Sequence, residues 1–180
     1  MHTDQIRLSK TLSHALRHEP QSYNIALDKE GWVDLSQLIN GLRARGWRNL
    51  RAEDIVSVVE KSEKKRFQIL DGRIRAYYGH STEEKIIKQP QAPPDVLYHG
   101  TSAESVNEIM TQGLLPMSRQ YVHLSTDTAT AKIVASRRKG SNISILTILA
   151  RQAYDEGISF YKEENGIWLC DRLLPAYIRL

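Results

Sequence analysis

The sequence predicts an α+β protein built from two lobes, and three features of the chain support this fold class. Residues 1–82 carry apolar side chains at helical spacing, followed by a hairpin signal. Residues 96–180 are instead rich in short apolar runs that are typical of strands. Between them, residues 83–95 hold three prolines in a polar stretch with no helical or strand period. We therefore expect a helical lobe, a linker and a strand-rich lobe.

The first lobe is expected to begin with three helices. Leucines recur at a spacing of four between residues 8 and 16, which predicts a helix that ends before Pro20. Apolar residues at 35–42 mark one face of a second helix, and Asp34 is placed to cap its first turn. A third helix is predicted from the apolar residues at 55–59.

A β-hairpin is expected to close the first lobe. Asp71-Gly72, a dipeptide typical of two-residue turns, separates the runs 66–70 and 73–78. Strand alternation places Arg73 and Arg75 on one face of this hairpin. Three helices followed by a wing-like hairpin resemble a winged-helix domain, which is a common shape among nucleic-acid-binding proteins. A resemblance of fold alone says little about function.

The second lobe is expected to contain short, mainly antiparallel strands and two helices. The predicted strands cover residues 96–98, 121–124, 143–149, 158–161, 167–169 and 176–180. One helix is predicted to end near Gly113, and the other to run from about Asp127 to Arg138. Asn165-Gly166 is a second hairpin signal.

Composition narrows the class of protein. The net charge is +4, and 15 of the 25 basic residues are arginine, whose planar fork can bind two phosphate oxygens at once. A single cysteine, Cys170, excludes an internal disulfide and a cysteine metal cage. No apolar run approaches the ~20 residues of a membrane span, and residues 1–10 lack the apolar core of a signal peptide. We expect a cytoplasmic protein with an anionic partner.

Two short segments of the second lobe look like strands that end in histidine and small polar residues. They are Leu97–Ser102 and Tyr121–Ser125, and the first leads into a predicted helix at 103–110. Gly100 would let the backbone approach a ligand closely, and a helix N-terminus attracts phosphate. The first segment therefore predicts a binding place for a phosphorylated cofactor.

Arginine beside histidine forms a second kind of candidate site. Arg17-His18 closes the first predicted helix, and Arg75 is followed by Gly79-His80-Ser81. Arginine supplies charge and histidine a second donor, which is the chemistry of a phosphate clamp. The alternative is structural, because cations stabilise a helix C-terminus and hairpin faces are often basic.

No metal site is expected. His14 and His18 stand four residues apart, but no third ligand is near and Arg17 would repel a cation. The sequence also lacks a Walker loop, a dinucleotide-binding Gly-x-Gly-x-x-Gly and a nucleophile elbow. Paired carboxylates for general acid–base work are missing from the histidine and arginine motifs.

Taken together, these segments resemble the RNA 2′-phosphotransferase family, the KptA-type enzymes of tRNA splicing. The matching segments follow the family order along nearly the whole chain. They are Leu12-Ser13, Leu16-Arg17-His18, Asp28, Gly31-Trp32-Val33, Lys65-Arg66-Phe67, Ile74-Arg75-Ala76, Gly79-His80-Ser81, Leu97-Tyr98-His99-Gly100-Thr101, Val122-His123-Leu124-Ser125 and Asn165-Gly166-Ile167-Trp168-Leu169. One departure is Tyr77-Tyr78, where the family often carries glutamine before Gly-His-Ser.

The resemblance implies a winged-helix-like lobe at 1–82 that binds the RNA 2′-phosphate and an ADP-ribosyltransferase-like lobe at 96–180 that binds NAD⁺. NAD⁺ is consumed as a co-substrate. An internal RNA 2′-phosphate attacks the ribose C1″ and expels nicotinamide, and the 2″-hydroxyl then attacks phosphorus. The products are 2′-hydroxyl RNA and ADP-ribose 1″,2″-cyclic phosphate. Because the attacking RNA 2′-phosphate is already anionic, the reaction needs correct placement and positive charge rather than a general base or a metal.

The resemblance also assigns roles to single residues. The residues implied for the RNA 2′-phosphate are Arg17, His18, Arg75 and an arginine late in the helix after His123, where Arg138 is preferred over Arg137. The residues implied for NAD⁺ are His99, Gly100, Thr101, Ser102, Arg119, His123 and Ser125. Arg119 could instead contact the RNA phosphate.

The sequence is also compatible with two other functions. An ADP-ribosyltransferase acting on nucleic-acid phosphate ends would use the same NAD⁺ site and stop after the first step. A non-catalytic RNA-binding module would use the basic charge and the winged-helix-like lobe without NAD⁺. In the leading interpretation, the partner is a tRNA-like RNA with an internal 2′-phosphate, and the protein acts as a monomer without membrane contact.

Overall fold

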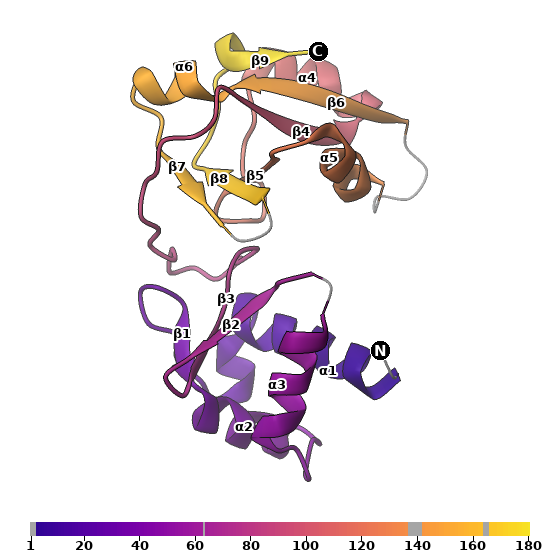
Figure 1. Ribbon diagram of the computed structural model, residues 1–180, viewed down its shortest axis with the longest axis vertical. Helices are drawn as coiled ribbons and strands as arrows, with labels where there is room; N and C mark the ends of the chain where they lie inside the picture. Colours follow the sequence, from indigo (N-terminus) through magenta and orange to yellow (C-terminus); the bar gives the residue numbers. More distant parts are fainter. Residues whose placement is uncertain (1–2, 63, 137–141, 164–165) are drawn as a thin grey trace. The chain divides into compact units, whose positions relative to one another are not determined.

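A computed structural model describes residues 3–62, 64–136, 142–163 and 166–180 of the chain (Figure 1). The chain forms two compact units, residues 1–88 and 89–180. The division falls inside the segment 83–95 that the sequence marks as a linker. Each unit combines helices with an antiparallel sheet, in agreement with the predicted α+β class.

The first unit packs helices against one face of a three-stranded sheet. Its elements are α1 (Thr3–Arg17), a 3₁₀ helix (Pro20–Tyr23), β1 (Trp32–Asp34), α2 (Leu35–Ala44), α3 (Ala52–Lys61), β2 (Phe67–Leu70) and β3 (Arg73–Ala76). The strand order is β1-β3-β2, with β3 in the middle. Leu12, Leu38, Ile55 and Ile74 are fully buried between the sheet and the helices, so this unit has a core of its own.

The predicted helices and hairpin of this unit are confirmed. Asp71 (φ 48°) and Gly72 (φ 73°) are both left-handed, as the tight turn between β2 and β3 requires. Asp34 precedes α2 as predicted, but its side chain accepts no hydrogen bond from the helix backbone. Strand β1 was not predicted, because a three-residue strand is too short to show a period of two.

The second unit is built around a six-stranded sheet. Its elements are β4 (Val96–Ser102), a 3₁₀ helix (Ala103–Ser105), α4 (Val106–Gln112), β5 (Val122–Ser125), α5 (Thr128–Ala135), β6 (Ile143–Leu149), α6 (Ala150–Asp155), β7 (Phe160–Lys162), β8 (Ile167–Cys170), a 3₁₀ helix (Pro175–Tyr177) and β9 (Ile178–Arg179). The strand order is β7-β8-β5-β4-β6-β9, and every pair is antiparallel.

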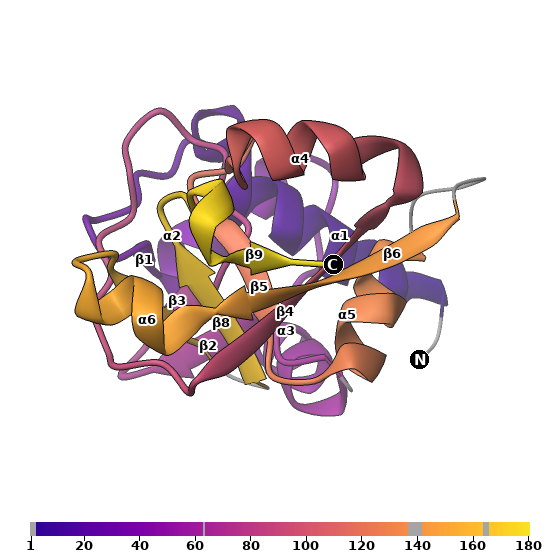
Figure 2. The same cartoon turned by 90° about the horizontal axis from the view of Figure 1, so that it is seen from above.

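Helices cover both faces of this sheet. The apolar core around Leu97 and Leu146 includes residues of α6 and is flanked by Val106 of α4. Helix α5 packs against β4 on the other face, where Ala131 is buried. In Figure 2, α4 and α5 lie on the two sides of β4 and β6. One face of β4 therefore lies against the apolar core, and α5 partly covers the other.

The structure corrects several predicted boundaries in this unit. Strand β4 does not end at Tyr98 but continues through Ser102. Helix α6 was not predicted, and the predicted last strand is reduced to the short β9 after a 3₁₀ turn. The predicted helix end at Arg138 and the turn residue Asn165 lie outside the described residues. Within the described part of the chain, no helix is both long and apolar enough to cross a membrane.

Candidate functional site

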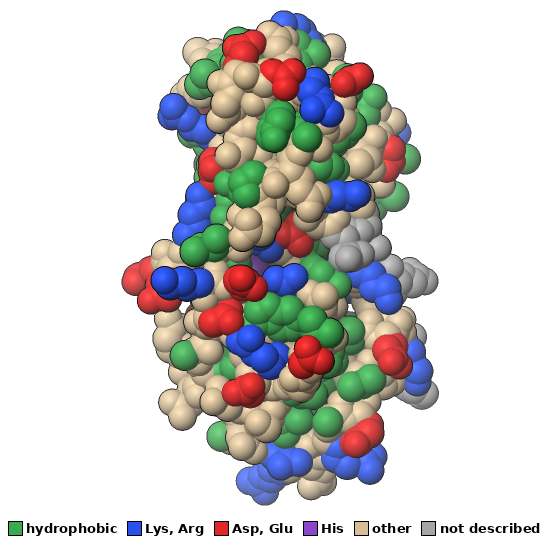
Figure 3. All heavy atoms as spheres, turned by 60° about the vertical axis from the view of Figure 1, so that its left-hand side comes forward, with side chains coloured by type: hydrophobic (Ala, Val, Ile, Leu, Met, Phe, Trp, Pro, Cys, Tyr) green, Lys and Arg blue, Asp and Glu red, His purple; other side chains and the backbone are tan. Residues whose placement is uncertain are grey.

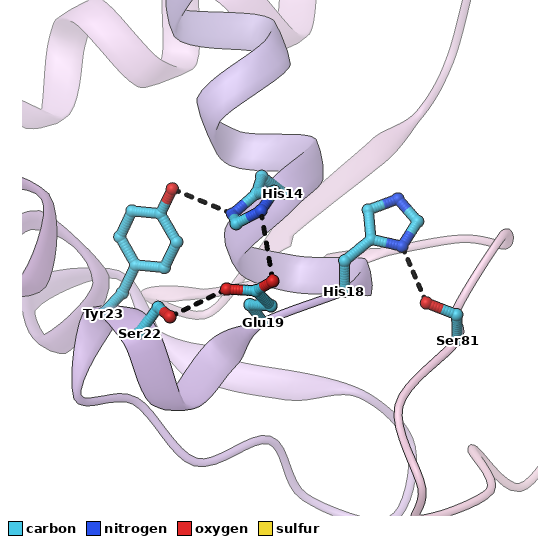
Figure 4. Close-up of polar contacts among 6 residues, drawn as sticks. All are labelled: His14, His18, Glu19, Ser22, Tyr23 and Ser81. Carbon is cyan, nitrogen blue, oxygen red and sulfur yellow. Dashed lines mark hydrogen bonds and ion pairs between the residues drawn. The ribbon is translucent and has the colours of Figure 1, made fainter.

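In the first unit, the end of α1 is joined to the segment that follows β3. The backbone carbonyl of Arg17 accepts a hydrogen bond from the N–H of Ser81 (2.9 Å). Next to it, Nδ1 of His18 lies 2.8 Å from Oγ of Ser81, as Figure 4 shows. The structure thus brings Arg17-His18 and Gly79-His80-Ser81 together, although more than sixty positions separate them in the sequence.

Aromatic rings hold the guanidinium of Arg17. Its Cζ lies 5.6 Å from the ring centre of Phe67 and 5.2 Å from that of Tyr78, and its Nη2 donates to the carbonyl of Arg66 (3.4 Å). A Cβ at Gly79 would lie 3.5 Å from Nη1 of Arg17. The cation is therefore kept in a defined position at the open end of the β2–β3 hairpin, as a phosphate-binding arginine needs.

Arg75 projects from the middle strand of the small sheet. It pairs with Trp32 on β1 and with Gln68 on β2, and its Cζ lies 4.5 Å from the indole centre. Its Nε donates to Oε1 of Gln68 (2.9 Å). Gln68 directly follows Phe67, the ring beneath Arg17, so the two predicted phosphate arginines are held by consecutive residues of β2.

Arg73, two residues earlier on β3, makes different contacts from those of Arg75. Its Nη2 forms an ion pair with Oδ2 of Asp28 (2.6 Å), a carboxylate that also accepts from the N–H groups of Glu30 and Trp32. Partial burial by itself would raise the pKa of Asp28, but these hydrogen bonds and the charge of Arg73 lower it below its usual value. Arg73 therefore has a structural partner within its own unit.

A histidine–tyrosine–glutamate cluster lies beside His18 and was not predicted from the sequence. Nδ1 of His14 is 3.1 Å from the hydroxyl of Tyr23, and its Nε2 is 3.8 Å from Oε1 of Glu19 (Figure 4). Glu19 also accepts a hydrogen bond from the hydroxyl of Ser22 (2.9 Å). No sequence pattern indicated this cluster, because the turn after α1 decides which side chains meet.

In the second unit, the two predicted histidines are linked through backbone. Nδ1 of His99 lies 2.9 Å from the carbonyl oxygen of His123, and Nδ1 of His123 lies 3.0 Å from that of Tyr121. A carbonyl oxygen can only accept, so Nδ1 is the donor in both rings. The neutral form of each histidine then carries its lone pair on Nε2.

The segment His99-Gly100-Thr101 lies within a strand and not at a strand–helix elbow. It is paired along its length with β6, and α4 begins only after a 3₁₀ turn. A Cβ at Gly100 would lie 2.1 Å from the backbone oxygen of Ala131. Close packing of α5 on β4 thus accounts for glycine here, in place of the close approach of a ligand that was predicted from the sequence.

The other predicted NAD⁺ residues lie on or near the same strands. Thr101 and Ser125 are buried polar residues of β4 and β5, and the Oγ atoms of Ser102 and Ser105 are 3.0 Å apart. Arg119 is exposed in the bend before β5, where its N–H donates to the carbonyl of Pro116. The predicted phosphate residue Arg138 and its alternative Arg137 lie outside the described residues.

Two surface hollows lie away from the predicted residues. One of about 450 Å³ in the second unit is lined by Asp95, Arg151 and Glu156 among others, and one of about 500 Å³ in the first unit by Tyr23 and Gln37 among others. No predicted site residue lines either of them. Figure 3 shows a face on which Lys and Arg are interspersed with Asp and Glu. The candidate residues are therefore described by their local contacts.

Comparisons with known proteins point to the same family that the motifs resemble. The chain matches the model of a family described as RNA 2′-phosphotransferase, Tpt1 / KptA family, over residues 3–172. A protein of Acetivibrio thermocellus named probable RNA 2′-phosphotransferase is 45% identical over 177 residues, which cover 98% of this chain and 97% of the relative. Proteins of the same name from Bacillus thuringiensis subsp. konkukian (44%, covering 96% and 94%) and Escherichia coli K12 (46%, covering 94% and 92%) are also similar.

Proposed function

This chain belongs to the RNA 2′-phosphotransferase, Tpt1 / KptA family, and from that premise we propose that it moves an internal RNA 2′-phosphate to NAD⁺. The observation that carries the proposal is the family match over residues 3–172, which covers most of both units. The products would be RNA with a 2′-hydroxyl, nicotinamide and ADP-ribose 1″,2″-cyclic phosphate. NAD⁺ is a substrate in this scheme and is used up.

The first unit is proposed to act as a winged-helix-like lobe that holds the RNA phosphate. Arg17 and Arg75 would supply the charge, and His18 would supply a further hydrogen bond. The stacked positions of the two guanidinium groups support this assignment, because aromatic rings hold each cation in a defined position and Gln68 binds Arg75 at Nε. Arg138, which lies outside the described residues, is proposed as a fourth phosphate contact.

The second unit is proposed to act as an ADP-ribosyltransferase-like lobe that holds NAD⁺. His99 and His123 donate through Nδ1 to backbone carbonyls, which fixes the orientation of both rings, and the two rings are proposed to contact the NAD⁺ ribose. Thr101, Ser102, Ser125 and Arg119 are proposed to hold the remainder of the dinucleotide. A neutral histidine suits this role because the departing nicotinamide leaves positive charge at C1″.

The proposed reaction needs charge balance at both steps. In the first, a 2′-phosphate oxygen forms a bond to C1″ while the C1″–nicotinamide bond breaks. In the second, the ribose 2″-oxygen forms a bond to phosphorus while the bond to the RNA 2′-oxygen breaks, and the 2″-hydroxyl proton passes to that oxygen. Negative charge gathers around phosphorus in the second step, where arginines stabilise it.

The test is a single reaction with a defined RNA. The purified protein is incubated with NAD⁺ and an RNA that carries one internal 2′-phosphate, and RNA, nicotinamide and cyclic phosphate are measured. Loss of the 2′-phosphate with one nicotinamide per phosphate is expected. A phosphate that stays on the RNA at stoichiometric enzyme, with no nicotinamide released, contradicts the proposal.

The same reaction separates the two alternative functions. Stable ADP-ribosylated RNA without cyclic phosphate indicates a transferase that stops after the first step. Salt-sensitive RNA binding with no affinity for NAD⁺ indicates a binding module. Calorimetric NAD⁺ binding that is lost in His99→Ala contradicts the binding module.

A further inference from the structure

A row of three residues crosses the outer face of the small sheet in the first unit. Trp32 on β1 pairs with Arg75 on β3, and Arg75 pairs in turn with Gln68 on β2. Paired residues project to the same face of a sheet. The neighbouring pair, Val33 and Ile74, is buried in the core and so marks the opposite face.

The two outer members of this row hold the middle one in place. Trp32 stacks on the guanidinium, with Cζ 4.5 Å from the ring centre, and Gln68 accepts the Nε proton at 2.9 Å. Stacking fixes the plane of the guanidinium, and the bond at Nε fixes its rotation within that plane. Neither Nη1 nor Nη2 of Arg75 donates a hydrogen bond to any described residue. These two atoms form the fork that matches two phosphate oxygens.

Arg73 on the same face shows that this arrangement is specific to Arg75. Its Nη2 is bound to Asp28, and its Cζ is 5.7 Å from the Trp32 ring. Both arginines therefore lie against the same indole, but only Arg75 is held at Nε with its fork clear of a carboxylate.

We propose that Gln68 and Trp32 are positioning residues, which hold the fork of Arg75 in the orientation that takes two oxygens of the RNA 2′-phosphate. This inference rests on the proposed function, which supplies that phosphate. Neither residue contacts the phosphate, and both act through Arg75. A guanidinium that is already oriented needs no reorganisation as charge develops at phosphorus.

The first experiment removes only the Gln68 oxygen that accepts the hydrogen bond from Nε of Arg75. Gln68→Met keeps the length of the side chain and lacks the oxygen. We expect kcat/KM for the 2′-phosphorylated RNA to fall about tenfold, and the KM for NAD⁺ to change less than about twofold. Leu70→Ala, on the same strand and face, is the matched control and should stay within about twofold of wild type.

A double-mutant cycle distinguishes positioning from a general structural role. Gln68→Met is combined with Arg75→Lys, whose side chain has no Nε–H to donate and no fork to orient. If Gln68 acts through Arg75, adding Gln68→Met to Arg75→Lys changes kcat/KM by less than about twofold. Losses that multiply in the double variant overturn the proposal.

Binding supplies a second measurement that does not depend on turnover. The Kd for 2′-hydroxyl RNA divided by the Kd for 2′-phosphate RNA measures how much the phosphate contributes to binding. This ratio should fall in Gln68→Met and in Trp32→Leu. Trp32→Phe should restore part of it. Trp32 is buried, so Gln68→Met provides the test if a Trp32 variant fails to fold. Wild-type protein that transfers no phosphate overturns the proposed function. Active wild type with an unchanged Gln68→Met in both measurements overturns only this inference.

Discussion

Arg75 stands directly opposite Trp32 in the register of β3 and β1, with its guanidinium carbon 4.5 Å from the centre of the indole ring. Trp32 and Arg75 lie far apart in the sequence, and β1, the strand that brings them together, has only three residues. Packed against an aromatic face on one side and bound at Nε by Gln68, this arginine has little rotational freedom left. Its charge is therefore available at a fixed point on the surface of the first unit.

Replacing Arg75 by lysine should impair phosphate transfer and leave NAD⁺ binding intact. Lysine keeps the charge but loses both the fork and the bond to Gln68. We expect kcat/KM to fall roughly 30- to 1000-fold, or about 2–4 kcal/mol of transition-state stabilisation. Arg73→Lys is the control, because a lysine can still pair with Asp28. An equal loss of NAD⁺ affinity by calorimetry would contradict the division of roles between the two units.

Replacing Gly100 by alanine should destabilise the second unit. The added methyl would lie 2.1 Å from the backbone oxygen of Ala131 and 2.9 Å from Cβ of Ala135, so α5 must move away from β4. We expect a loss of about 2 kcal/mol or more in the free energy of unfolding, measured in urea. Ser144→Ala on the neighbouring strand is the control and should change it by less than about 0.5 kcal/mol. Wild-type stability in Gly100→Ala would show that α5 is not packed as described.

The ion pair between Asp28 and Arg73 should make stability depend on acid pH. The pKa of Asp28 is lower in the folded protein than in the unfolded chain, so its stabilising effect is full above the unfolded value and disappears as the pH falls through the folded one. Asp28→Asn should therefore be less stable than wild type at about pH 7, and this difference should shrink towards about pH 3. Asp71→Asn, at an exposed turn, is the control. A difference that stays constant with pH would exclude this role for the carboxylate.

Cys170 should report on opening of the second unit. It is the single cysteine of the chain and is fully buried in β8, and burial raises the pKa of its thiol, with a further contribution from Asp171. A maleimide at about pH 7 should therefore label it slowly in the native protein and rapidly in urea. A Thr111→Cys variant supplies an exposed thiol as the comparison. Equal labelling of Cys170 before and after unfolding would contradict its burial.

The long periodic elements and the strong turn were predictable from the sequence. The leucines of α1 and the Asp71-Gly72 turn act through local geometry, so neighbouring residues carry enough information to place them. Strand β1 and helix α6 were missed because each is too short to show a period, and their positions depend on partners far along the chain. The same limit explains the error at β4, whose last residues look like a turn until β6 pairs with them.

The candidate residues were found in the sequence, but their surroundings were not. Arg17, His18 and Arg75 stand out because arginine and histidine at these spacings suit phosphate chemistry. Which rings stack on each guanidinium could not be read from spacing, since Tyr78 and Trp32 come from segments that only folding brings together. The explanation for glycine at position 100 also changed, because a Cβ added there would contact an atom of α5.

The sequence by itself determined the fold class, the order of the family motifs and the types of residue that could hold a phosphate. These properties depend on local periodicity and on side-chain chemistry, and both can be read from neighbouring residues in the sequence. Only the tertiary structure decided that Arg73 is bound to Asp28 while Arg75 is held by Gln68 and Trp32. The two arginines are equivalent in strand alternation, and only the residues that cross-strand pairing and the neighbouring loop place beside them make them different.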